Sequence, residues 1–300
     1  MRIAVTGGAG FIGSHVVDRL HGAGHTVVVV DGRGPHRADV EHAPADLRDL
    51  ESLVAATRGC DAIFHLAAVS NVNDVFASPV DAVDVNVTGT TRVLEAGRRN
   101  SVERVFFAST VWVYGSAVGD GDLREDALVD TQLPAHLYTT SKIASELVIR
   151  SYDELYGVPF TILRYGVPFG PRMRDELVIP RFVRMALENQ TITVDGDGHQ
   201  YRNYVYVEDL AEAHVLALDP VAQGEVFNLE GPAPVSLREM IAALESVLGR
   251  EIAVEYGPAR PGDFRGRPVS GRKAEKLLDW KPKTSFEEGL RRYVEWYTAG

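Results

Sequence analysis

Cysteine is nearly absent from this sequence, in which Cys60 is the only one among 300 residues. An internal disulfide is therefore excluded. Because the sequence contains no Cys/His cluster either, the composition favours a reducing compartment and argues against a structural metal site. No run of residues approaches the roughly 18 apolar positions that a membrane span requires. We expect a cytoplasmic protein that binds no metal and does not contact a membrane.

Basic residues are also in short supply. Lys and Arg number 31 against 42 Asp and Glu, which gives a formal net charge of −11. A chain this acidic is repelled by phosphate backbones unless it carries a concentrated basic face, so nucleic acid is not an expected partner. The composition is otherwise ordinary, with 45% apolar and 24% charged residues. It is sufficient for one large α/β domain or for a domain plus a smaller lobe.

The first half of the chain alternates regularly between two patterns. Short apolar runs, continuous as in strands covered on both faces, lie at 2–5, 26–30, 62–67, 104–109 and 160–165. Amphipathic patterns of helical period lie between them, at 11–22, 47–57, 79–99 and 138–156. This alternation predicts an α/β fold with a doubly wound parallel sheet and right-handed crossovers.

The second half of the chain has a looser rhythm. Helical patterns lie near 175–189, 207–218, 236–249 and 286–298, and turn-rich segments interrupt them at 195–200 and 256–263. We expect residues 1–166 to form a Rossmann domain, with 201–230 returning to it. Residues 167–300 are expected to form mainly a smaller, interleaved C-terminal lobe that binds the substrate.

A glycine motif opens the chain in the segment RIAVTGGAGFIGSH, residues 2–15. A predicted strand leads into Gly7, Gly10 and Gly13, and a predicted helix follows. Small residues let the backbone turn sharply and approach a pyrophosphate, and the helix N-terminus offers unpaired N–H donors. The alternative is a glycine-rich turn with no ligand, but the strand before and the helix after favour a dinucleotide site.

Asp31 ends the second predicted strand, about twenty residues after the glycine motif. A carboxylate at this place accepts hydrogen bonds from both ribose hydroxyls and repels a 2′-phosphate, which favours NAD over NADP. Arg33 and Arg37 lie close by and could instead attract that phosphate. We interpret them as solvated loop charges.

The segment YTTSK contains Tyr138 and Lys142 at helical spacing, so both side chains can lie on one face of a helix. A free tyrosine, with a pKa of about 10, is a poor base at neutral pH. An ammonium group a few ångströms away favours the phenolate, so we expect Lys142 to lower the pKa of Tyr138. The alternative is an ordinary surface pair.

Together these motifs resemble the extended short-chain dehydrogenase/reductases, and among them the nucleotide-sugar epimerases and dehydratases such as UDP-glucose 4-epimerase. Further segments occur in the order typical of that family and extend the resemblance over nearly the whole chain. They are DLRD (46–49), HLAA (65–68), VNVTGT with Asn86, STVWVYG (109–115), LRYGVPFGP (163–171), YRNYVYVEDLA (201–211) and RPGD (260–263).

The resemblance implies that NAD is the cofactor and indicates which residues contact it. Asp46 and Leu47 would contact the adenine, Ala67 and Ala68 the nicotinamide side of the pocket, and Asn86 the pyrophosphate side. Lys142 would bind the nicotinamide ribose. The full set of expected cofactor residues is Gly7, Gly10, Phe11, Ile12, Gly13, Asp31, Asp46, Leu47, Leu66, Ala67, Ala68, Asn86, Tyr138, Lys142 and Tyr165.

The resemblance also implies a catalytic set of Thr110, Tyr138 and Lys142. The Thr110 hydroxyl can donate and accept at once, and so can hold the substrate oxygen while a proton moves. Dehydratases of this family carry an Asp-Glu pair after that threonine, and decarboxylases carry a glutamate, whereas this chain has Val111 and Trp112. Neither side chain can carry a proton.

An epimerase needs no such acid. We therefore expect epimerisation of a nucleotide-sugar at C4, most simply of the UDP-glucose/UDP-galactose type, by transient hydride transfer to tightly bound NAD and a 4-keto intermediate. Two alternatives stay open. One is a nucleotide-sugar 4-ketoreductase or another NAD(P)-dependent sugar-nucleotide oxidoreductase, and the other is a non-catalytic NAD-binding module.

A locally basic segment lies near the C-terminus. Residues 256–273 contain Arg260, Arg265, Arg267, Arg272 and Lys273 against the single acid Asp263. With Arg202, these guanidinium groups suit a diphosphate, although a solvated basic loop is the alternative. The resemblance implies substrate contacts from Thr110, Val167, Arg202, Arg260 and Asp263.

The chain departs from its family at one place on the substrate side. Many sugar-nucleotide epimerases read R-Y-F-N where this chain reads Arg164-Tyr165-Gly166-Val167, so a valine replaces the asparagine that contacts the substrate. Arg172 or Arg174 is a candidate to compensate. The family also pairs the helices that match 79–99 and 138–156 across a two-fold axis, so we expect a homodimer.

Overall fold

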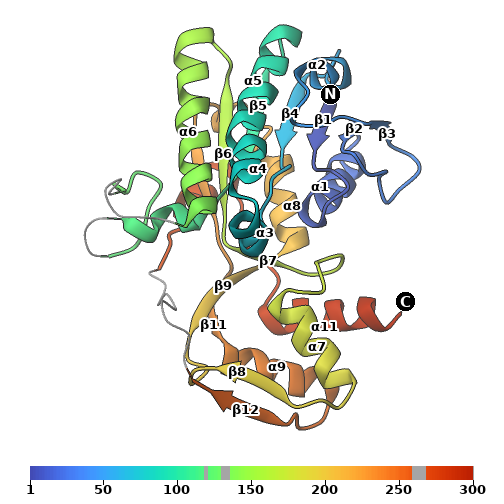
Figure 1. The fold of residues 1–300 in the computed structure, drawn as a ribbon, viewed down its shortest axis with the longest axis vertical. Helices are drawn as coiled ribbons and strands as arrows, with labels where there is room; N and C mark the ends of the chain where they lie inside the picture. The colour runs from blue at the N-terminus through green and yellow to red at the C-terminus, as the bar shows by residue number, and fades with distance from the viewer. Residues whose placement is uncertain (118–120, 130–135, 259–267, 300) are drawn as a thin grey trace.

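The computed structural model describes residues 1–117, 121–129, 136–258 and 268–299. Within these ranges, seven parallel strands form one twisted sheet (Figure 1). In sheet order they are β10 (Val226–Leu229), β6 (Phe160–Tyr165), β5 (Arg104–Thr110), β4 (Ala62–His65), β1 (Arg2–Thr6), β2 (Thr26–Val30) and β3 (Glu41–Ala43). The predicted doubly wound sheet is confirmed. Its five predicted strands are all present, and β3 and β10 are additional.

Helices cover both faces of this sheet (Figure 1). On one face lie α1 (Phe11–Gly22), α8 (Val207–Leu216) and α10 (Arg272–Leu278). On the other lie α2 (Leu50–Ala56), α5 (Gly89–Asn100) and α6 (Leu137–Tyr156). The shorter helical segments are α3 (Val72–Ala77), α4 (Pro79–Val83), the π-helix η1 (Asp84–Thr88) and the 3₁₀ helices η2 (Val111–Ser116) and η3 (Pro220–Ala222). None of the helices described is both long and apolar enough to cross a bilayer.

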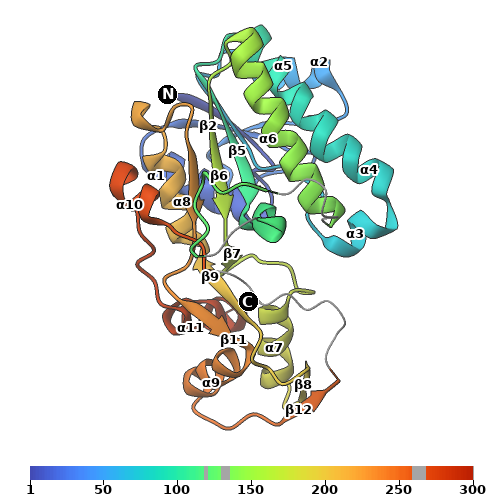
Figure 2. The same cartoon turned by 90° about the vertical axis from the view of Figure 1, so that its left-hand side faces the viewer.

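A smaller lobe lies beyond the carboxyl end of β6, which runs directly into it (Figures 1 and 2). Its strands form two small sheets, β11 (Pro234–Ser236), β9 (Tyr201–Tyr206) and β7 (Val167–Phe169) in one, and β12 (Val254–Gly257) and β8 (Ile192–Asp195) in the other. Its helices are α7 (Val178–Leu187), α9 (Leu237–Leu248) and α11 (Phe286–Thr298). They enclose a separate apolar core that includes Phe169, Phe182, Tyr206 and Leu290.

Two glycines allow the large sheet and the lobe to meet closely. Gly166 links β6 to β7, and a Cβ there would lie 2.7 Å from Glu230 Oε2. A Cβ at Gly231, just after β10, would lie 1.9 Å from the Tyr204 carbonyl oxygen. Any larger residue at either place would separate these strands, and the glycines thereby bring β9 of the lobe to the ends of β6 and β10.

Candidate active site

A tight glycine turn joins β1 to α1 and packs on the residues that follow β4. Gly7 has a left-handed backbone, with φ +72°, and a Cβ there would lie 2.7 Å from the Ala67 nitrogen. A Cβ at Gly13 would lie 2.1 Å from the Gly7 carbonyl oxygen, so only glycine allows this approach. Gly10 caps α1 without a side-chain hydrogen bond. The first N–H groups of α1 remain available to an anion, and this cradle fits the diphosphate of a dinucleotide.

Asp31 follows β2, and its carboxylate points back to the glycine turn. Oδ2 accepts a hydrogen bond from the Ala9 nitrogen at 3.2 Å, and Oδ1 accepts one from the Arg33 nitrogen at 3.0 Å. Arg37 instead forms ion pairs with Asp18 and Asp39. The Asp31 carboxylate therefore has a fixed place beside the turn, as a ribose-binding acid of a Rossmann fold requires.

The other expected cofactor residues surround the same end of the sheet. In the first turn of α1, Phe11 is half-buried with its ring edge-on to His15, and Ile12 packs on the sheet core. After β3, Asp46 is exposed and Leu47 is buried. Directly after β4, the half-buried positions are Leu66, Ala67 and Ala68.

Two expected cofactor residues use their polar groups inside the protein. The buried Asn86 amide exchanges hydrogen bonds with the Val69 backbone at 2.8 and 3.0 Å, and it donates to Ser141 Oγ at 3.1 Å. The buried Tyr165 hydroxyl is hydrogen-bonded to His214 Nε2 at 2.6 Å. In the structure, these side chains fix the segment after β4 and the end of β6, and so position the walls of the site.

The predicted catalytic residues gather at the end of β5. Thr110 is its last residue, and its Oγ1 accepts a hydrogen bond from the Trp112 nitrogen at 3.2 Å. Tyr138 lies in the first turn of α6, with its ring edge-on to the Trp112 ring and the ring centroids 6.1 Å apart. Lys142, one turn later, donates from Nζ to the Ala108 carbonyl oxygen at 2.7 Å. Helix α6 therefore brings the tyrosine and the lysine to the strand that carries the threonine.

The expectation that Lys142 lowers the pKa of Tyr138 is wrong for this arrangement. Burial raises the pKa of Tyr138 to about 12, and the nearby Arg174 opposes that shift only in part. The Lys142 ammonium lies 5.9 Å from the centre of the Tyr138 ring and is directed at the Ala108 carbonyl. Its own pKa falls to about 8 through burial, against the influence of Glu146. A further positive charge beside the phenol is required before Tyr138 can release its proton near neutral pH.

A buried polar network supports α6 behind these residues. Glu146 accepts hydrogen bonds from Ser109 Oγ at 2.6 Å and from Arg164 at 2.6 and 3.0 Å. Arg164 also donates to the Tyr114 hydroxyl at 2.6 Å. The paired contacts hold the helix on β5 and β6. Glu146 was not among the residues predicted from the sequence, although its position four residues after Lys142 places it on the same helix face.

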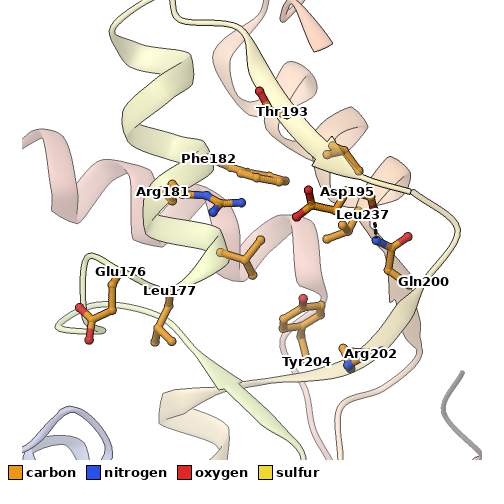
Figure 3. Close-up of a pocket in the computed structure, with 12 residues that line it drawn as sticks. Glu176, Leu177, Arg181, Phe182, Thr193, Asp195, Gln200, Arg202, Tyr204 and Leu237 are labelled. Carbon is orange, nitrogen blue, oxygen red and sulfur yellow. Dashed lines mark hydrogen bonds between the residues drawn. The ribbon is translucent and has the colours of Figure 1, made fainter. Parts of the chain in front are cut away.

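The small lobe contains a pocket of about 360 Å³. Figure 3 shows Arg181 and Phe182 from α7 facing Asp195 from β8 across it. Its lining residues are Glu176, Leu177, Val178, Arg181, Phe182, Thr193, Val194, Asp195, Gln200, Arg202, Tyr204 and Leu237. Of these residues only Arg202 was predicted from the sequence, because the lining comes from α7, β8, β9, the start of α9 and the segments beside them, which meet only in the fold.

Of the predicted substrate residues Val167, Arg202, Arg260 and Asp263, only Arg202 lines this pocket in the described structure. Arg202 lines the pocket and donates to the Tyr201 carbonyl oxygen at 2.7 Å. Val167 lies in β7, opposite Tyr204, and packs on the core of the lobe. Arg260 and Asp263 lie outside the residues that the structure describes. In the described part of the chain, no three His, Cys, Asp or Glu side chains gather as metal ligands.

The parallel sheet, the glycine cradle and the Thr-Tyr-Lys set are those of an extended short-chain dehydrogenase/reductase. The model of the NAD dependent epimerase/dehydratase family matches residues 3–229, and the chain belongs to this family. A UDP-glucose 4-epimerase from Mycolicibacterium smegmatis is 34% identical over 313 residues, which cover 99% of this chain and 98% of that protein.

Solved structures agree with this assignment. A UDP-glucose 4-epimerase from Thermotoga maritima, crystallised with UDP-glucose, has a TM-score of 0.92 and 31% identity, covering 100% of this chain and 99% of that one. A UDP-glucuronic acid 4-epimerase from Bacillus cereus, in complex with UDP-glucuronic acid and NAD, has a TM-score of 0.89 and 28% identity, with coverage of 100% and 99%. NAD is therefore the cofactor, and the glycine cradle fits it.

Proposed function

We propose that this protein epimerises a UDP-hexose at C4, as in the interconversion of UDP-glucose and UDP-galactose. One observation carries the proposal. Thr110, Tyr138 and Lys142 meet at the end of β5, while the two residues after Thr110 are Val111 and Trp112. The site thus contains groups that move one proton on and off a sugar hydroxyl, without the neighbouring acid that elimination or decarboxylation uses.

The residues divide the proton chemistry between them. When bound, NAD supplies the acceptor and donor of hydride at the sugar carbon. Thr110 Oγ1 accepts a hydrogen bond from the Trp112 nitrogen, which leaves its O–H to donate to the sugar oxygen. Tyr138 takes the proton of that hydroxyl and returns it. Lys142, fixed by the Ala108 carbonyl, orients the cofactor side of the cleft.

The pocket in the small lobe supports a nucleotide as the other half of the substrate. Its lining combines the guanidinium groups of Arg181 and Arg202 with the aromatic rings of Phe182 and Tyr204. Arginine binds phosphate oxygens through its planar fork, and an aromatic ring suits a base. A UDP moiety would occupy this pocket, with the sugar directed to the end of β5.

A UDP-hexuronic acid is the second candidate substrate. Arg174 lies close enough to oppose the raised pKa of Tyr138. It is paired with the exposed Glu176 at 3.5 Å, and Arg172 is paired with Asp18 at 2.8 Å. A guanidinium beside the catalytic phenol suits a carboxylate at C6 of the sugar. This observation favours UDP-glucuronic acid as the alternative to UDP-glucose.

The test is turnover of UDP-glucose, UDP-galactose and UDP-glucuronic acid by purified protein without added cofactor. We expect 4-epimerisation with bound NAD and no net consumption of NADH. Arg174→Met should impair only the uronic acid, if that is the substrate. With NAD⁺ added, stoichiometric formation of NADH and a keto sugar, which is the reverse of a ketoreductase reaction, would establish an oxidoreductase instead. Binding without turnover would establish a non-catalytic module.

A further inference from the structure

Trp112 is an indole that the fold leaves open to solvent within the active site. It is 42% exposed, while Val113 and Tyr114, the next residues of η2, are each 2% exposed. Large aromatic side chains contribute most when they are covered, so an uncovered one beside catalytic groups indicates a surface for a ligand. The reaction derived above uses no chemistry from this side chain.

The position of Trp112 is fixed from two directions. Its backbone nitrogen donates to Thr110 Oγ1 at 3.2 Å, so its place depends on the residue that holds the substrate oxygen. Its ring meets the Tyr138 ring edge-on, with an interplanar angle of 87° and centroids 6.1 Å apart. Trp112 therefore borders both groups that act on one sugar hydroxyl, Thr110 through its backbone and Tyr138 through its ring.

We infer that Trp112 forms the apolar wall of the sugar subsite and covers the C–H face of the hexose. This inference rests on the proposed function. A pyranose presents C–H groups with slight positive charge, and the face of an indole is electron-rich, so the two surfaces attract and exclude water together. The site thereby selects a hexopyranose with an unobstructed C–H face. Trp112 acts on the sugar and not on the nucleotide.

The chain provides a matched control for Trp112. Trp296 on α11 is 43% exposed and packs on Tyr293 in the small lobe, so it has equal access to solvent in a different place. Tryptophan fluorescence of the NAD-bound protein is measured during titration with UDP and with UDP-glucose. We expect UDP-glucose to change the emission more than UDP does. Trp112→Phe should abolish this difference, and Trp296→Phe should leave it intact.

Kinetics give a second readout. Trp112→Ala should raise the KM for the UDP-sugar by roughly tenfold, with kcat less affected, because the lost contact is with the bound sugar. Inhibition by UDP and the NAD content should stay unchanged. Trp112→Phe should recover part of the loss.

The outcomes separate the two hypotheses. Suppose that the wild-type protein turns over UDP-hexoses, that Trp112→Ala has the wild-type KM and that Trp112→Phe retains the fluorescence difference. The role of Trp112 in the sugar subsite is then refuted, and the proposed function stands. If the wild-type protein neither binds nor converts any UDP-hexose, both are refuted.

Discussion

Tyr138 and Lys142 lie where burial opposes the charge on each of them. Burial raises the pKa of the phenol to about 12 and lowers that of the ammonium to about 8. Both groups are thus shifted toward their neutral forms, and an added positive charge beside the phenol is needed before Tyr138 releases its proton near neutral pH. Function at this site depends on the local electrostatics more than on the intrinsic acidity of tyrosine.

Tyr138→Phe should abolish most of the turnover and leave the fold and the bound NAD intact. Within the described residues the Tyr138 hydroxyl makes no hydrogen bond, so its removal should change the free energy of unfolding little. General acid-base groups contribute about 10²–10⁴-fold to rate, and we expect a loss of turnover in that range. The measurement is UDP-sugar epimerisation, with NAD content determined separately. Tyr152→Phe, also half-buried on α6, is the control, and equal activity of both variants would contradict a catalytic Tyr138.

Glu230 is a second residue whose pKa follows from burial. Its Oε2 occupies the space that a Cβ at Gly166 would fill and has no hydrogen-bond partner in the described structure. Burial raises the pKa of Glu230 from 4.5 to about 8, against hydrogen bonds from Asn203 and Gly231. Between these values the folded protein binds more protons than the unfolded chain, so this group should stabilise the fold below pH 4.5 and lose that contribution as the pH rises toward 8.

Glu230→Gln should remove this dependence on pH. The free energy of unfolding of the wild-type protein should fall relative to the variant by up to about 1.4 kcal/mol per pH unit across this window. Urea denaturation at pH 5, 6.5 and 8 measures the difference. The exposed Glu251→Gln is the control. A constant difference between wild type and Glu230→Gln at all three values would show that Glu230 does not titrate differently on folding.

At the scale of elements, helix α1 contains two glycines, of which one has no room for a side chain and the other has open space. A Cβ at Gly13 would meet the Gly7 carbonyl oxygen at 2.1 Å, whereas a Cβ at Gly22 would meet nothing within 4 Å. Gly13→Ala must therefore displace the turn that binds the diphosphate. We expect it to weaken NAD binding at least tenfold, roughly the 1.4 kcal/mol that corresponds to such a factor.

Gly22→Ala tests the same helix without the close contact. It should retain NAD and leave stability unchanged or raise it by up to about 1 kcal/mol, because alanine favours a helix. Bound NAD per chain and the melting temperature distinguish the two variants. Equal NAD content in both would mean that the turn tolerates a Cβ at Gly13 and that the cradle is wrongly described.

The elements that the sequence predicts are those whose own residues determine them. The five predicted strands are buried on both faces and so have continuous apolar runs, and α1 and α6 have clear periodicity. β3 is three residues long at the sheet edge, and β10 contains Asn228, which accepts a hydrogen bond from Tyr114. These two strands depend on distant partners, and no local pattern indicates them.

The same distinction applies to the site. Spacing alone placed Tyr138 and Lys142 on one face of a helix, and the structure has them so. The spacing could not show that Lys142 donates a hydrogen bond to the Ala108 carbonyl, because that contact requires β5 to lie beside α6. The pocket of the small lobe likewise forms mainly from α7, β8, β9 and the start of α9, which meet only after folding.

At the scale of the whole molecule, one face of the large domain exposes apolar side chains. Helices α4 and α6 pack together there, and Figure 2 shows them on the same side of the sheet. Val80 on α4 is 81% exposed, and Leu147 and Leu155 on α6 are 59% and 69% exposed. Patches of this kind are typical of protein interfaces, and we predict a homodimer that uses this face.

Leu147→Glu should dissociate that dimer, because a buried, unpaired carboxylate opposes association. Sedimentation velocity at micromolar concentration should give a dimer for the wild type and a monomer for the variant. Val221→Glu, a change of the same kind at the 44% exposed Val221 of η3, should remain dimeric. A monomeric wild-type protein under these conditions would refute the prediction.

The place of β10 beside β6 has a consequence for how the chain reaches its fold. Ile162 and Val226 are neighbours in the sheet, but the first strands of the small lobe lie between them in the sequence. During synthesis, β6 therefore emerges with one edge unpaired and keeps it open until the ribosome has passed residue 229. Contacts of such long sequence separation slow folding, and open edges of buried strands promote aggregation. We expect fragments that end before β10 to aggregate, and expression of the full chain to benefit from slow synthesis or from chaperones that cover that edge.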